Sequence, residues 1–73
     1  MAASADDGDM IERLARVEHD QWMAWSKTVA AEVSAERRTA WQRCWVPYDE
    51  LTEEQKEHDR EWARRALAAL RAP

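Results

Sequence analysis

Residues 45–55, WVPYDELTEEQ, contain the clearest boundary in the chain. Pro47 lacks an amide hydrogen and its ring disfavours a helical conformation at the preceding Val46, so the segment 46–51 is predicted to be a connector. Thr52 follows it as a helix cap, with Gln55 in the reciprocal position of a capping box. We therefore expect a Pro-containing connector that leads into a C-terminal helix.

Upstream of the connector, apolar residues recur at intervals of three and four, which is the spacing of one helix face. Asp9 is a candidate cap with Glu12 as its capping-box partner, which predicts a long first helix over about 10–33. Its apolar positions are Ile11, Leu14, Ala15, Trp22, Trp25, Val29 and Val33, interrupted by Glu18 and His19. Residues 1–8 are acidic and rich in small residues, and we expect them to be a disordered leader.

Ser34 is a plausible cap for a second, shorter helix over about 35–45. The alternative is one helix that continues to residue 44, since neither Gly nor Pro separates the two segments. We favour the break because a single long helix would bury its Trp side chains poorly in a monomer.

The composition agrees with a helical fold. One Gly, two Pro and few β-branched residues leave little turn or strand chemistry. We predict an all-α, small three-helix domain over 9–73, with a long first helix and a short middle helix. A domain of 73 residues is marginally stable alone, so we expect the Trp side chains to form the bulk of its core and a homo-oligomer to complete it. Five Trp exceed the needs of one small core, so we expect some of them to line a cleft or an interface.

The charge and the cysteine content exclude several classes of protein. A net charge of −4 argues against a protein that binds duplex nucleic acid. No apolar run is long enough to span a membrane, and Cys44 has no second cysteine with which to form an intrachain disulfide. We therefore expect a cytoplasmic protein.

The sequence gives little support for catalysis. Glu-His-Asp occurs at 18–20 and again at 57–59, but there are only two His residues and neither has a second His four positions on. Nothing local marks Cys44 as an activated nucleophile. We predict a protein without enzymatic activity, metal or cofactor.

Aromatic and cationic residues suggest a binding function instead. Stacking faces with a guanidinium or ammonium group are what a nucleotide site requires. The candidates are Trp22 and Lys27 on the first helix, and Arg37, Trp41 and Trp45 on the second. The alternative is that these Trp side chains are simply core residues.

The chain resembles the RyR domain, the repeat found in ryanodine receptors and in short bacterial and phage proteins. The family opens with Leu-Ala, then a His and a Trp, as in Leu14, Ala15, His19 and Trp22, and Lys27 lies one position from the family's Lys. Residues 45–51, followed by Glu54, Lys56, Asp59 and Arg60, resemble its second conserved segment. The family's central Gly-containing loop is missing, because residues 28–44 contain no Gly.

The resemblance implies a helical module that binds an adenine-nucleotide type of ligand without turning it over. It places His19, Trp22, Pro47 and Tyr48 along the binding cleft, with Leu14, Ala15 and Leu51 as packing. We predict a protein that binds or sequesters a small anionic, nucleotide-type signal. The alternative is a protein-interaction module that uses an exposed, Trp-rich helical surface.

Overall fold

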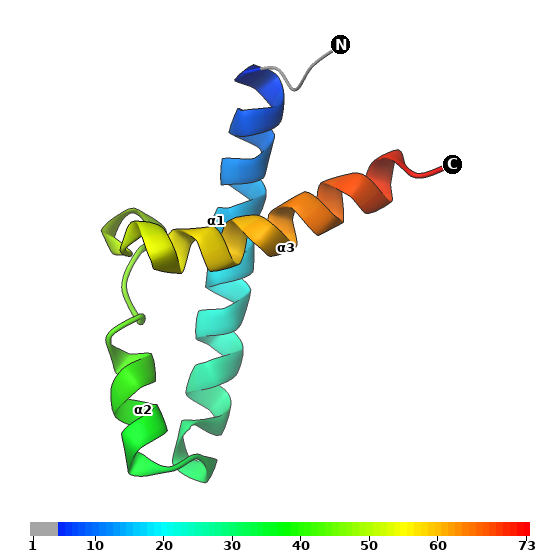
Figure 1. Ribbon diagram of the computed structural model, residues 1–73. Coiled ribbons are helices and arrows are strands. Elements are labelled where there is room, and N and C mark those ends of the chain that lie inside the picture. Colours follow the sequence, from blue (N-terminus) through cyan, green and yellow to red (C-terminus); the bar gives the residue numbers. More distant parts are fainter. Residues whose placement is uncertain (1–4) are drawn as a thin grey trace.

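The computed structural model describes residues 5–73, and those residues form helices joined by short turns (Figure 1). The elements are α1 (Ala5–Val29), the 3-10 turn η1 (Ala30–Glu32), α2 (Ala35–Gln42), the 3-10 turn η2 (Tyr48–Glu50) and α3 (Glu53–Arg71). No strand occurs within this part of the chain. The predicted three-helix, all-α fold with a long first helix is confirmed. None of the described helices is long and apolar enough to cross a membrane.

Local capping chemistry fixes two of the helix ends as predicted. The Ser34 hydroxyl accepts the backbone N–H of Arg37 at 3.1 Å, so α2 begins as a separate helix. Thr52 and Gln55 form both bonds of a capping box at the start of α3, at 3.1 and 3.0 Å. The alternative of one helix running to residue 44 is therefore wrong.

The start of α1 differs from the prediction. The helix begins at Ala5, so residues 5–8 are helical, and Asp9 lies within the helix, where it pairs with Arg13 at 2.9 Å. Asp9 is therefore not the cap, and Glu12 is not its capping-box partner. The remainder of the predicted leader, residues 1–4, lies outside the described residues.

The helices form an open arrangement rather than a bundle. α3 crosses the middle of α1, whereas α2 runs beside the C-terminal half of α1 (Figure 1). Ala15 and Ala63 are completely buried, and their small side chains allow the two helix backbones to approach closely. Tyr48, Leu51 and Leu67 complete the buried apolar core. The connector therefore supplies part of the core as well as the link between helices.

The Trp side chains do not form the bulk of the buried core, which corrects that part of the prediction from composition. Trp25 is 54% exposed and Trp62 is 55% exposed. The half-buried Trp22 and Trp41 meet edge to face, with ring centroids 5.9 Å apart. Trp45 donates its indole N–H to the buried Ser26 hydroxyl at 3.0 Å. Most of the indoles thus attach α2 to α1, and two of them remain accessible.

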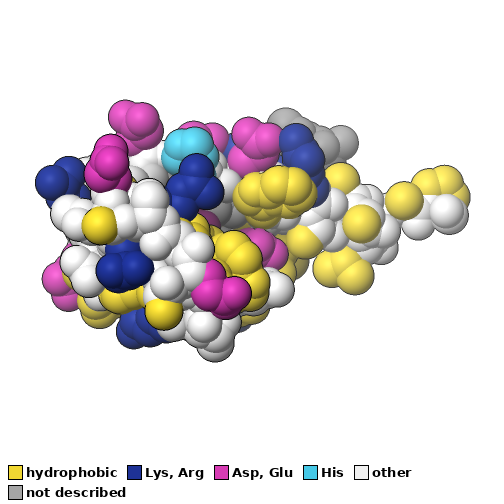
Figure 2. All heavy atoms as spheres, turned by 90° about the horizontal axis from the view of Figure 1, so that it is seen from below, with side chains coloured by type: hydrophobic (Ala, Val, Ile, Leu, Met, Phe, Trp, Pro, Cys, Tyr) yellow, Lys and Arg dark blue, Asp and Glu magenta, His cyan; other side chains and the backbone are white. Residues whose placement is uncertain are grey.

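An ion-pair network ties the connector to both long helices. Glu12 accepts hydrogen bonds from Arg60 Nε at 2.6 Å and from the Tyr48 hydroxyl at 3.0 Å. Arg16 pairs with Asp49 at 2.7 Å and lies over the Tyr48 ring. These contacts hold α1, η2 and α3 together around one tyrosine. Beyond them, the C-terminal end of α3 projects from the body and carries hydrophobic side chains at the surface (Figure 2).

Candidate functional site

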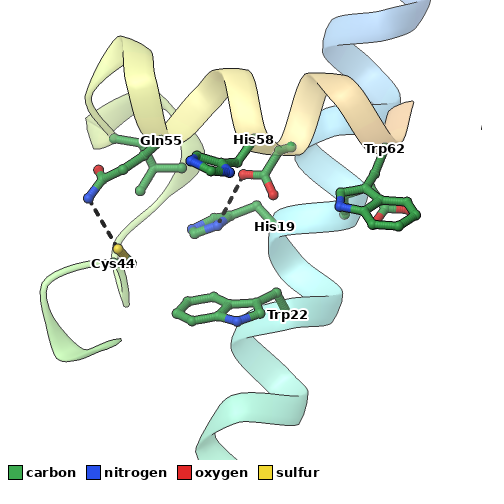
Figure 3. Close-up of a pocket in the computed structure, with 9 residues that line it drawn as sticks. His19, Trp22, Cys44, Gln55, His58 and Trp62 are labelled. Atoms are coloured by element: carbon green, nitrogen blue, oxygen red, sulfur yellow. Dashed lines mark hydrogen bonds and ion pairs between the residues drawn. The ribbon is translucent and has the colours of Figure 1, made fainter. Parts of the chain in front are cut away.

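A cleft of about 390 Å³ opens where α1, the connector and α3 meet (Figure 3). This volume is typical of the smaller pockets that bind small molecules. The lining residues come from all three segments: Glu18, His19, Trp22, Cys44, Leu51, Gln55, His58, Asp59 and Trp62.

The cleft brings together the two Glu-His-Asp segments of the sequence. Glu18 and His19 face it from α1, and His58 and Asp59 face it from α3. Trp22 follows His19 by three residues, just as Trp62 follows Asp59 by three residues, so each Trp lies one helical turn beyond its polar neighbour. The result is one site with an imidazole, a carboxylate and an indole from each helix.

His19 is the polar centre of the cleft. Its side chain is almost fully buried, and its Nε2 lies 2.7 Å from the Val46 carbonyl oxygen. Because a carbonyl can only accept, Nε2 carries a hydrogen, and Nδ1 faces the Asp59 carboxyl at 3.6 Å. The imidazole also stacks on Trp22, with ring centroids 6.0 Å apart. These contacts fix the ring plane that forms the floor of the cleft.

Asp59 carries an acidic group into this partly dry environment. Burial raises the pKa of the Asp59 carboxyl above its ordinary value, and the nearby Glu18 carboxylate adds to the rise, whereas His19 and His58 oppose it. The cleft therefore places two acidic side chains, Glu18 and Asp59, near one another.

Cys44 lies at the cleft without the features of a nucleophile. Burial raises the pKa of its thiol, and the Asp59 carboxylate raises it further. Its sulfur accepts a hydrogen bond from Gln55 Nε2 at 3.2 Å (Figure 3). A protonated, hydrogen-bonded thiol is suited to lining the site rather than to attacking a substrate.

Two of the eight predicted site residues, His19 and Trp22, line the cleft. Lys27 lies instead over the Trp45 ring at 5.7 Å, on the side of α1 that faces α2. Trp41 contacts Trp22 and Trp25, and Arg37 is exposed on α2. The structure does not bring these cations and indoles into the cleft with His19.

The predicted cleft wall formed by Pro47 and Tyr48 also needs correction. Pro47 is exposed at the start of η2, and Tyr48 is only 4% exposed, with its hydroxyl on Glu12. Burial raises the pKa of the Tyr48 hydroxyl, and its bond to Glu12 adds to this. Tyr48 is therefore a core residue, because the connector turns its ring toward the crossing of α1 and α3.

Sequence reasoning missed most of the α3 side of the cleft. The spacing of Trp62, Leu67 and Leu70 predicts only an apolar face for the last helix, and Gln55 is predicted only as a capping-box residue. The available signal was a Glu-His-Asp triplet closely followed by a Trp, because this combination occurs on both helices, although the Trp follows two residues after Asp20 and three after Asp59. Within residues 5–73, no group of three or more His, Cys, Asp or Glu side chains is arranged to hold a metal ion.

No family model, curated protein or solved structure matches this chain. The similarity to the RyR domain therefore rests on the motifs quoted above and stays a prediction.

Proposed function

We propose that this protein is a non-enzymatic binding module that takes the ring of a nucleotide-type ligand into the cleft between α1 and α3. The observation that supports this proposal is the pair of indoles, Trp22 and Trp62, that lines one cleft from two helices. Stacking of a base on an aromatic side chain contributes about 1–3 kcal/mol. Gln55 and His58 add polar groups for the edge of a ring.

The phosphate of such a ligand would remain outside the cleft. Glu18 and Asp59 line the interior and would repel an anion there. Arg65 lies over the Trp62 ring at 4.5 Å, where it also pairs with Glu61. Its guanidinium, 60% exposed, is the group that we propose meets the phosphate at the rim, in place of the predicted Lys27 and Arg37.

Calorimetric titration with free bases, nucleosides and linear and cyclic nucleotides tests this proposal. Trp62→Ala should weaken the binding of the best ligand by about tenfold to a hundredfold. Trp25→Ala is a matched control, since Trp25 is equally exposed but does not line the cleft. Failure of the native protein to bind any member of the panel would overturn the proposal.

A protein-interaction module is the second candidate, favoured by the exposure of Trp25, Trp62 and Leu70. In that case the surface would meet a partner helix or a second copy, and nucleotides would not raise the melting temperature. A homo-oligomer and a cytoplasmic location are part of both proposals.

A further inference from the structure

The cleft is lined by acidic side chains but by neither Lys nor Arg among the described residues. The acidic residues are Glu18 and Asp59. Several acidic side chains elsewhere in the described residues are closely paired with Arg. Such pairs are Glu12 with Arg60, Asp49 with Arg16, and Glu57 with Arg64. The interior of the cleft therefore offers negative charge to whatever occupies it.

Asp59 is a largely buried carboxylate of the cleft. Its side chain is 17% exposed, and its ion-pair partner is His19 Nδ1 at 3.6 Å, which is longer than a hydrogen bond. A cation placed in the cleft would interact with this carboxylate where solvent screening is weak. A cation in the cleft would therefore gain an interaction with Asp59 that a neutral occupant lacks.

The aromatic walls favour the same kind of occupant. The faces of indole rings attract cations, and this attraction strengthens when the cation leaves bulk water. Trp22 lines the cleft from α1 and Trp62 lines it from α3 (Figure 3). A flat ring that carries a positive charge could stack on the indoles and also be attracted to the carboxylates.

We infer that the cleft selects a positively charged heterocycle, such as an N-alkylated pyridinium or purine, over its neutral counterpart. This inference rests on the proposed binding of a ring in the cleft, and it specifies the class of that ring. The ring charge pairs with Glu18 and Asp59, while any phosphate stays at the rim near Arg65.

Matched ligand pairs isolate the ring charge. Oxidised and reduced nicotinamide mononucleotide share ribose and phosphate, and 7-methylguanosine and guanosine share their sugar. The cationic member of each pair should bind about tenfold more tightly. Equal binding within both pairs would overturn the selectivity and leave the ring-binding function standing. If no member of these pairs and no nucleotide binds, the proposed function itself fails.

Variants then locate the source of the selectivity. Glu18→Gln removes a cleft carboxylate that has no ion pair among the described residues, so the fold should persist and most of the preference should disappear. Asp20→Asn changes the net charge equally on the same helix, at an exposed position that does not line the cleft, and should leave the preference intact. An unchanged preference in Glu18→Gln, or an equal loss in both variants, would overturn the inference.

Discussion

At the scale of single residues, Glu12 joins two distant segments of the chain to α1. Arg60 from α3 and Tyr48 from the connector both donate to its carboxylate. The hydrogen bond from Arg60 lowers the pKa of Glu12 below its ordinary value of 4.5, and the Tyr48 hydroxyl lowers it further. Because the folded-state pKa is the lower one, this contribution to stability is complete above the unfolded pKa and is lost as the pH falls through the folded pKa.

Glu12→Gln should therefore lower the stability near neutral pH and flatten the loss of stability in acid. We expect the free energy of unfolding to fall by about 1 kcal/mol, a value that allows for the partial exposure of the carboxylate. This corresponds to a fall of roughly 4–8 °C in the melting temperature. Thermal unfolding followed from pH 7 to pH 3 measures both effects. Glu50→Gln, at an exposed position in η2, is the control, and its stability should fall with decreasing pH in the same way as that of the native protein.

The residue scale also shows where sequence reasoning stops. His19 interrupts the predicted apolar face, yet it is buried, because the Val46 carbonyl bonds its Nε2 and the Asp59 carboxyl faces its Nδ1 at 3.6 Å. These partners lie 27 and 40 positions further along the chain. Helical spacing identified His19 and Trp22 as one surface, but only the folded chain shows that α3 supplies the other half of the site.

At the scale of elements, the sequence predicted the helix ends that local capping bonds determine. It did not predict the start of α1. Ser34, Thr52 and Gln55 cap helices through neighbours within three residues, so their pattern is sufficient. Asp9 has a similar local pattern, but the preceding residues continue the helix and its carboxylate turns to Arg13. A cap is therefore recognised reliably only where the chain before it leaves the helical conformation.

The capping box gives a direct prediction for α3. Thr52→Ala removes the hydroxyl that accepts a hydrogen bond from the backbone N–H of Gln55. The substitution should lower the free energy of unfolding by about 1 kcal/mol. Thr39→Ala is the matched control, because the Thr39 hydroxyl donates to the Ala35 carbonyl within α2 and caps no helix end. Chemical denaturation measures the difference. Equal stability of the two variants would contradict the assigned role of the capping box.

α2 depends on its indole contacts more than on its own length. It has eight residues, which is too short for a stable isolated helix, and Trp41 contacts both Trp22 and Trp25 of α1. Trp41→Ala should therefore release α2 while the crossing of α1 and α3 persists. Hydrogen exchange should show lost protection over residues 38–45 but retained protection around Ala15 and Ala63. Global loss of protection would instead mean that the chain folds as one indivisible unit.

At the scale of the whole molecule, the chain is too extended for its mass. Its radius of gyration is 14.2 Å, against about 11 Å for a compact domain of this length. Its accessible surface is 5529 Å², against about 4,700 Å² for a typical monomer of 8.6 kDa. The excess of roughly 800 Å² equals one partner's share of a standard interface. The predicted homo-oligomer would cover part of this surface.

The exposed flank of α3 is the surface that we expect to associate. Leu70 is 78% exposed and Trp62 is 55% exposed, and Ala66 and Ala69 fall on the same side at intervals of three and four residues. A second copy could pack the same stripe against this one, as two-fold dimers do. Each chain has a net charge of −4, so added salt should strengthen the association by screening the repulsion.

Leu70→Glu should abolish this dimer without changing the helix content, because Leu70 contributes little to the buried core. Sedimentation equilibrium at micromolar concentration should find about twice 8.6 kDa for the native chain and 8.6 kDa for the variant. Val17→Glu introduces the same charge at a similarly exposed position on α1 and should leave the dimer intact. A native chain that sediments as a monomer at low and high salt would contradict self-association. Loss of the dimer in Val17→Glu alone would move the interface from α3 to α1.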